Sequence, residues 1–178
     1  LFRSHTCLLA LRTGRPVRIA YGREESFYGH VHRHPAQIWM RHHADRSGKI
    51  VKIESRMVFD GGAYCSTSPA VLINGITHTQ GPYKCDNAIV DGWAVRTNNP
   101  PCGAMRGFGV VQACFAHESQ MEKLASVLGM SPVDVRLVNA METGDTLITG
   151  QVMDSVAPVA QCIQETADIP LPPPLDPN

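Results

Sequence analysis

The sequence predicts a mixed α+β domain in which a long antiparallel hairpin and further strands pack against helices. Two long segments alternate between apolar and polar residues on either side of a turn sequence, as half-buried strands do. Later segments carry helical periodicity and are bounded by proline or glycine. Because these elements do not follow a strict strand–helix–strand order, the class is α+β, or loosely α/β. With 178 residues and 43% hydrophobic composition, the chain is large enough to bury a core.

The first residues predict a helix and then a strand. Residues 3–13 have the pattern of the last part of a helix, which Gly14 and Pro16 end. Residues 17–22 alternate between apolar and polar or small side chains, which predicts a strand.

A long hairpin is predicted next. Alternation with a period of two runs from residue 30 to residue 42 and resumes from residue 49 to residue 59. Between these segments, Asp45-Arg46-Ser47-Gly48 is a turn sequence. The glycine pair at residues 61 and 62 interrupts the second strand.

A short helix and a further strand are predicted after the hairpin. Residues 68–79 form the helix, with Ser68 as its N-cap and a proline at its first position. Residues 87–96 resume the alternation of a strand. We expect Trp39 and Trp93, which fall on predicted strands, to be packing residues.

The strongest helical pattern covers residues 110–128. Gly129 ends this helix, and its charged residues are expected on the solvent-exposed face. The expected exposed charges are Glu118, Glu122 and Lys123. The apolar stripe expected to face the core consists of Val110, Cys114, Met121, Leu124 and Leu128.

Two shorter helices complete the prediction. Ser131 caps the first of them, and residues 155–167 form the second. Residues 169–178 are rich in proline, so we expect a disordered tail there and a domain that covers residues 1–168.

Charge balance and cysteine spacing argue against several classes of protein. Sixteen basic and sixteen acidic residues leave a formal net charge of zero, whereas nucleic acids and anionic membranes select a basic surface. The six cysteines lie far apart without a Cys-x-x-Cys pair, which disfavours zinc and iron–sulfur sites. Scattered thiols fit a reducing compartment. We therefore expect a cytoplasmic protein that binds neither nucleic acid nor membrane.

The segment from Asn98 to Gly109 carries the most chemical information. Two prolines stiffen its start, and three glycines at positions 103, 107 and 109 permit close approach and positive φ angles. The helix that follows presents unpaired N–H groups, which suit an anionic or oxo-bearing ligand. The same residues would also suit a tight strand-to-helix connection whose glycines serve only geometry.

Four motifs follow one another along the chain. They are Thr13-Gly14-Arg15-Pro16-Val17 with Arg23-Glu24-Glu25, Asp60-Gly61-Gly62-Ala63-Tyr64, Gly81-Pro82-Tyr83 with Val90-Asp91-Gly92, and Thr97-Asn98-Asn99-Pro100-Pro101 through Met105-Arg106-Gly107-Phe108-Gly109 and Gln112. In this order they resemble the molybdenum-binding large subunit of the xanthine dehydrogenase and aldehyde oxidase family. The resemblance spans about residues 2–165. It implies a partial molybdopterin-binding domain.

The resemblance also implies a chemistry and a set of site residues. Family members hydroxylate N-heterocycles or aldehydes with oxygen from water, using molybdenum held by a pyranopterin. The backbone around Met105, Arg106 and Gly107 would contact the molybdenum end of this cofactor. Phe108 matches an aromatic residue on which planar substrates pack. Asn74 occupies the position of a substrate-polarising arginine in purine-oxidising relatives, and an amide cannot replace a guanidinium in that role, which leaves the substrate open.

Other parts of the family's machinery are expected outside this chain. The resemblance places the catalytic glutamate, a first glycine loop and a second cofactor-binding domain elsewhere in the large subunit. Iron–sulfur and flavin (FAD) groups are expected on other domains or subunits. We therefore expect no catalytic residue and no direct metal ligand in this chain, and no turnover by the chain alone.

The residues also suggest a metal site, which spacing argues against, and two other functions, which remain open. His30, His32 and His34 share one face of a predicted strand, but alternate residues on a strand lie about 7 Å apart, too far for three ligands on one ion. The Gly103–Gly109 loop could instead belong to a noncatalytic module that binds a nucleotide or phosphate. A third possibility is an interaction or scaffold domain.

Overall fold

The structure is a computed structural model that describes residues 2–170 and divides into two compact units at the Val31–His32 junction. The first unit contains α1 (Phe2–Thr13) and α2 (Arg23–Gly29). The predicted strand at residues 17–22 is wrong, because no strand in the described part of the chain pairs with this segment. Instead, a short helix begins at Arg23, where the Glu25 carboxylate accepts a 2.6 Å hydrogen bond from the Gly22 N–H.

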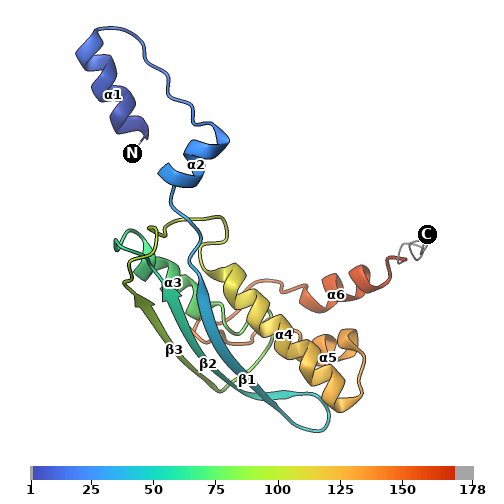
Figure 1. Cartoon of the computed structure of the whole chain (residues 1–178). Helices are drawn as coiled ribbons and strands as arrows, with labels where there is room; N and C mark the ends of the chain where they lie inside the picture. Colours follow the sequence, from blue (N-terminus) through green and yellow to red (C-terminus); the bar gives the residue numbers. More distant parts are fainter. Residues whose placement is uncertain (1, 171–178) are drawn as a thin grey trace, which may run out of the picture. The chain divides into compact units, whose positions relative to one another are not determined.

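The second unit is built on a three-stranded sheet with the order β1-β2-β3 (Figure 1). The strands are β1 (Ala36–Ala44), β2 (Ile50–Asp60) and β3 (Ala88–Val95). β1 and β2 form the predicted antiparallel hairpin, and β3 lies parallel to β2 on its other side. The first strand starts later than predicted. Pro35 precedes it and has no N–H group for a strand ladder.

Two helices cover one face of this sheet (Figure 1). α3 (Ser68–Thr77) packs on β3 and β2, and α4 (Val110–Leu128) packs on β1. The N-cap of α3 is Thr67 rather than the predicted Ser68, which is buried in the first turn.

The remaining helices follow α4. α5 (Pro132–Asn139) packs against α4, and its N-cap is Ser131, as predicted. α6 (Val159–Ala167) begins later than predicted and packs against α5. Residues 171–178, which make up most of the predicted tail, lie outside the described residues, and the predicted domain boundary at residue 168 stays a prediction.

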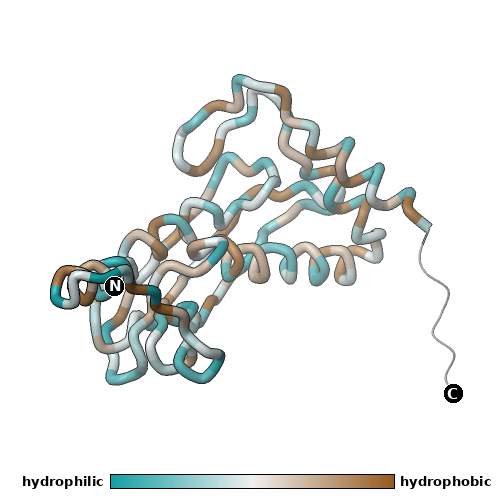
Figure 2. The backbone as a smooth tube through the Cα atoms, turned by 90° about the horizontal axis from the view of Figure 1, so that it is seen from above, coloured by the Kyte–Doolittle hydropathy of each residue, from teal (hydrophilic) through white to brown (hydrophobic). Residues whose placement is uncertain are grey.

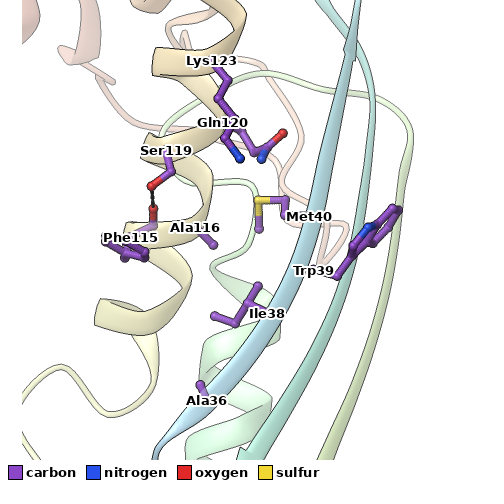
Figure 3. Close-up of a pocket in the computed structure, with 9 residues that line it drawn as sticks. All are labelled: Ala36, Ile38, Trp39, Met40, Phe115, Ala116, Ser119, Gln120 and Lys123. Carbon is purple, nitrogen blue, oxygen red and sulfur yellow. Dashed lines mark hydrogen bonds between the residues drawn. The ribbon is translucent and has the colours of Figure 1, made fainter.

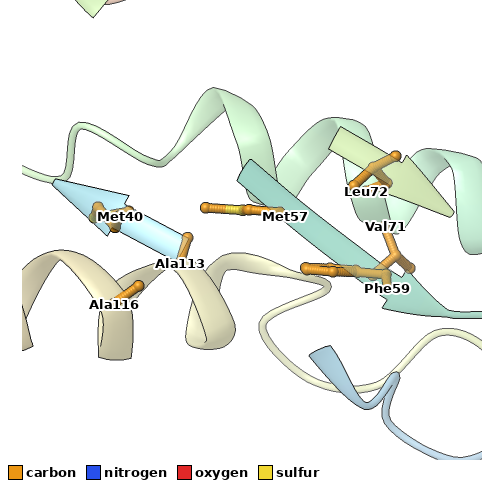
Figure 4. Close-up of a cluster of buried hydrophobic side chains, with 7 residues drawn as sticks. All are labelled: Met40, Met57, Phe59, Val71, Leu72, Ala113 and Ala116. Atoms are coloured by element: carbon orange, nitrogen blue, oxygen red, sulfur yellow. The ribbon is translucent and has the colours of Figure 1, made fainter. Parts of the chain in front are cut away.

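The core between the sheet and the two helices is formed by seven buried side chains (Figure 4). They are Met40, Met57, Phe59, Val71, Leu72, Ala113 and Ala116. A second cluster of Ile50, Ile53, Tyr83, Cys85, Met121, Ala125 and Val135 joins the far end of the hairpin to α4 and α5. Core packing therefore extends along the whole of β2.

The predicted apolar stripe of α4 is confirmed in part, because Met121 is buried and Leu124 packs against the second core cluster. Cys114 is wrongly placed in the stripe, since it is exposed. The buried face also includes Ala113, Ala116 and Ala125, which the prediction left out. Glu118 is also wrongly predicted as a free surface charge, because it accepts hydrogen bonds from the Tyr83 hydroxyl and the Arg136 guanidinium.

The opposite face of the sheet carries both tryptophans. Trp39 is 44% exposed and Trp93 is 49% exposed, so their predicted role as packing residues is wrong. Trp39 points away from α4 (Figure 3), and the guanidinium groups of Arg41 and Arg56 lie 5.1 and 5.7 Å from its ring centre. These are cation–π distances.

Apolar residues are distributed along the whole described chain. Figure 2 shows brown segments interrupted by white and teal ones throughout the tube. Among the described helices, none has both the length and the hydrophobicity needed to cross a membrane.

Two histidines, the partly buried His42 of β1 and the buried His117 of α4, have inaccessible ring nitrogens. His42 on β1 and His117 on α4 both have ring nitrogens that are buried without a hydrogen-bond partner in the described chain. Burial lowers the pKa of His42 to about 4, and the nearby His117 and His43 add to this effect while Glu118 opposes it. Burial also lowers the pKa of His117. The fold therefore holds His42 in its neutral form.

We expect stability to fall as the pH drops from about 6.5 to 4. The unfolded chain binds a proton at His42 in this range and the folded chain does not, so acid favours unfolding. One pKa unit corresponds to about 1.4 kcal/mol, which limits the effect of His42 to a few kcal/mol. Urea unfolding at several pH values should show a weaker pH dependence for His42→Leu. His30→Leu, at an exposed position, is the control, and an unchanged slope for His42→Leu would contradict the prediction.

Candidate functional site

The candidate site is the loop that runs from the end of β3 to the start of α4. The Asp60 carboxylate, at the end of β2, anchors its first part by accepting hydrogen bonds from the Thr97 hydroxyl at 2.6 Å and the Asn99 amide. Asp60 also accepts the Gly62 N–H at 2.9 Å, just beyond its own strand. These hydrogen bonds lower the pKa of Asp60, with the Thr97 contact contributing most. The end of β2 therefore holds the first residues of the loop in place.

A short extended segment, His32–His34, lies along the middle of the loop. His32 donates its N–H to the Pro101 carbonyl at 3.2 Å and accepts the Gly103 N–H at 3.0 Å. The guanidinium Nη2 of Arg33 donates to the Arg106 carbonyl at 2.7 Å. These contacts join residues that are about seventy positions apart in the sequence.

His34 continues this segment into the interior. Its Nε2 atom shares a 2.8 Å hydrogen bond with the buried Ser68 hydroxyl at the start of α3, and its carbonyl accepts the Gln112 side-chain amide at 3.1 Å. Burial lowers the pKa of His34, and the Asp60 charge partly opposes this. His34 therefore joins α3, α4 and the segment before β1.

In the backbone of the loop, the carbonyl groups are hydrogen-bonded but several N–H groups are not. Each carbonyl from Met105 to Phe108 accepts a hydrogen bond. The donors are the Phe108 N–H at 2.7 Å, Arg33 at 2.7 Å, the Val110 N–H at 2.9 Å and the Asn74 side-chain amide at 2.8 Å, in that order. By contrast, the N–H groups of Met105, Arg106 and Gly107 donate to no acceptor in the described chain.

This asymmetry gives the loop a partial positive character. Unpaired N–H groups in consecutive residues are hydrogen-bond donors that suit an anion or a polar oxygen. The Arg106 side chain makes no hydrogen bond or ion pair with other described residues, and both Arg106 and Gly107 are exposed. The donors of the loop are therefore accessible from solvent.

Phe108 holds a backbone conformation that is unusual for a residue with a side chain. Its φ angle is 46°, in the left-handed region, between Gly107 at 89° and Gly109 at 99°. Such a residue costs on the order of 1 kcal/mol or more and persists when its surroundings impose it. Its side chain is partly buried against the core cluster, and Asn74 holds its carbonyl.

Gly109 is required by close contact between two backbones. A Cβ atom at this position would lie 2.2 Å from the Val71 carbonyl oxygen of α3. The end of the loop therefore packs directly on the α3 backbone, which leaves no room for a side chain. In this way α3 sets the position of both Phe108 and Gly109.

The structure thus brings together all five residues named from the sequence. Met105, Arg106, Gly107 and Phe108 form the loop, and Asn74 reaches it from α3. Sequence reasoning did not identify Arg33 or Asp60 as parts of this site. Asp60 lies within a recognised motif, and Arg33-His34-Pro35 matches an Arg-His-Pro of the family, but neither match indicated a contact with the loop.

The groove between β1 and α4 and the histidines near β1 are weaker candidates for a functional site. A groove between β1 and α4 is lined by apolar residues together with Ser119, Gln120 and Lys123 (Figure 3), and it lacks any carboxylate, histidine or cysteine. In the described chain, no group of three histidine, cysteine or acidic side chains is placed to hold a metal ion. His32 and His34 serve instead in the contacts described above.

Fold and site together define an α+β domain with an exposed loop whose backbone N–H groups have no acceptor in the described chain. The sequence model of the molybdopterin cofactor-binding domain family matches residues 2–140. The chain therefore belongs to the molybdopterin cofactor-binding domain family.

Named relatives are consistent with this assignment. The chain is 40% identical over 164 residues to the nicotinate dehydrogenase large molybdopterin subunit of Eubacterium barkeri, a match that covers 92% of this chain and 39% of that protein. It is 33% identical over 142 residues to the aldehyde oxidoreductase of Megalodesulfovibrio gigas, covering 80% of this chain and 16% of that one. The chain thus spans well under half the length of these relatives.

Solved structures share the fold. The aldehyde oxidoreductase from Desulfovibrio gigas superposes with a TM-score of 0.81 at 30% identity, over 90% of this chain and 18% of that one. Quinoline 2-oxidoreductase from Pseudomonas putida 86 gives 0.80 at 31% identity, over 90% and 21%. These likenesses confirm the predicted α+β class and give no support to the nucleotide-binding alternative.

The close packing at Gly109 leads to a test with a matched control. We expect Gly109→Ala to destabilise the chain by several kcal/mol, because the new Cβ would overlap the Val71 carbonyl and the φ angle is positive. Gly129→Ala, also at positive φ but with no neighbour within 4 Å, should cost about 1 kcal/mol. Urea unfolding measures both, and equal losses would show that the contact with α3 is unimportant.

Proposed function

We propose that this chain forms one wall of the cofactor site of a molybdenum hydroxylase. The enzyme would hydroxylate an N-heterocycle or an aldehyde with water as the source of oxygen. This proposal is carried by the hydrogen bonding of the loop. All carbonyls from Met105 to Phe108 accept hydrogen bonds, whereas the N–H groups of Met105, Arg106 and Gly107 donate to no acceptor in the described chain. The names of the relatives, which include nicotinate dehydrogenase and aldehyde oxidoreductase, support the substrate class.

The loop fits the molybdenum end of a pyranopterin cofactor. That end carries oxygen and sulfur atoms that accept hydrogen bonds, and the free N–H groups of Met105, Arg106 and Gly107 are donors without partners in the described chain. When bound, the cofactor supplies the redox chemistry of the hydroxylation. The loop residues bind and orient it through the main chain, so the Arg106 side chain is not needed for the contact.

Phe108 is proposed to orient the substrate. Its ring is partly buried and its backbone is braced, so it offers a rigid aromatic surface beside the loop. A planar heterocycle that stacks on this surface would lie at a defined angle to the loop donors. Asn74 is proposed as a second substrate contact through the part of its amide that does not bind the Phe108 carbonyl.

The remaining machinery is proposed to lie outside this chain. Turnover requires a general base, for which we propose a glutamate elsewhere in the large subunit, and a route for electrons through iron–sulfur and flavin groups on other domains or subunits. The 178-residue chain by itself would then be inactive. We further propose a cytoplasmic enzyme that acts on a small molecule and binds neither nucleic acid nor membrane, consistent with the zero net charge and the free cysteines.

Cofactor retention tests the main-chain contact. In the purified assembled enzyme, Arg106→Ala should keep nearly all of its molybdenum, because the proposed contact uses the backbone N–H. Gly107→Val should lose cofactor by about tenfold, because its positive φ angle and the 2.7 Å approach to the Val111 side chain would force the loop to move. Metal analysis and pterin fluorescence measure both. A wild-type assembly without molybdenum or pterin that binds a nucleotide instead would refute the proposal.

Substrate kinetics test the role of Phe108. Phe108→Ala should raise KM for a planar heterocycle by up to about tenfold, since an aromatic pair is worth about 0.5–1.5 kcal/mol beyond its area. KM for a small aliphatic aldehyde should change less, and molybdenum content should stay constant. Phe115→Ala removes an exposed phenylalanine from the separate β1–α4 groove and serves as the control. Identical effects of both variants would contradict stacking on Phe108.

A further inference from the structure

Arg33 is the long-range partner of the carbonyl at the centre of the loop. Its Nη2 atom donates to the Arg106 carbonyl at 2.7 Å, a charge-assisted hydrogen bond. The backbone on either side of Arg33 is tied to the same region, since His32 pairs with Pro101 and Gly103, and His34 with Gln112. The backbone of Arg33, from which its side chain extends, is therefore held in place relative to the loop.

This contact determines the direction of a neighbouring donor. The described chain contains no cis peptide bond, and in a trans peptide the C=O and the following N–H point in opposite directions. Because Arg33 holds the Arg106 carbonyl, the Gly107 N–H points away from Arg33. The Met105 carbonyl accepts the Phe108 N–H, so the Arg106 N–H points away from the Phe108 N–H.

The arrangement leaves an unsatisfied group behind the loop. The other terminal nitrogen of Arg33, Nη1, is buried and has no hydrogen-bond partner among the described residues. A buried donor without a partner is unfavourable for stability. A role in stability alone therefore does not explain a guanidinium at this position. Orientation of the Arg106–Gly107 peptide by the Nη2 hydrogen bond does explain it.

We infer that Arg33 is a positioning residue for the cofactor: by holding the Arg106 carbonyl, it directs the Gly107 N–H toward the ligand. It does not touch the cofactor itself and acts through the loop backbone. This inference rests on the proposed function, because the ligand it serves is the one proposed for Met105, Arg106 and Gly107.

In the full chain, the rate of trypsin cleavage at the exposed Arg106–Gly107 bond measures how firmly Arg33 holds the loop. Arg33→Met should increase the cleavage rate at this bond by about tenfold relative to cleavage at Arg46 in the β1–β2 turn, since a hydrogen bond to a charged group is worth about that factor in a local opening equilibrium. Arg33→Lys keeps the charge and should give an intermediate rate. Arg96→Met is the matched control, because Arg96 also donates from its guanidinium to a backbone carbonyl, that of Ala63 at 3.1 Å.

Molybdenum content of the assembled enzyme separates this inference from the proposed function. Arg33→Met should retain several-fold less molybdenum than wild type or Arg96→Met, with partial recovery in Arg33→Lys. Equal rates at Arg106 and equal metal content in the Arg33 and Arg96 variants would overturn the role of Arg33 while the proposed function stands. Cleavage that rises at Arg46 as much as at Arg106 indicates general unfolding and also counts against the inference. A wild-type assembly without molybdenum would overturn the proposed function, and the positioning role with it.

Discussion

The hydrogen bonds that engage the carbonyls of Met105 to Phe108 are the constraint on which the site depends. Two of the donors are local N–H groups, and the other two are the side chains of Arg33 and Asn74. In a trans peptide the carbonyl and the following N–H point in opposite directions, so the engaged carbonyls of Met105 and Arg106 set the directions of the Arg106 and Gly107 N–H groups. These two N–H groups donate to no acceptor in the described chain, whereas the Phe108 N–H donates to the Met105 carbonyl.

The fold supplies these two side chains from two different elements. Arg33 comes from the segment that leads into β1, and Asn74 comes from α3, which packs on β2 and β3. The backbone contact between Gly109 and Val71 brings α3 within reach of the loop, and the buried His34–Ser68 hydrogen bond joins α3 to the first segment. A change in either contact would therefore shift the position of the loop.

The core explains why these elements stay in place. Alanines on α4 allow it to approach the sheet closely, and the methionines and Phe59 of the strands fill the space between the helices. Interiors of this kind are close-packed and transmit small shifts rather than absorb them. The position of the loop at the start of α4 is consequently tied to the same packing that makes the domain stable.

Local pattern in the sequence was sufficient for the hairpin, for β3 and for the helices that begin or end at proline or glycine, because alternation, periodicity and turn chemistry act over a few residues. The loop from Met105 to Phe108 was identified by its resemblance to a contiguous motif of the family, because its glycine spacing alone also suits a simple strand-to-helix connection. Tertiary structure alone decided that residues 17–22 lack a strand partner, that the alanine face of α4 is buried and that Trp39 and Trp93 are exposed. It likewise decided that Arg33 and Asn74 meet the loop, because a hydrogen bond between residues 73 positions apart depends on how the chain packs and leaves no periodic trace in the sequence.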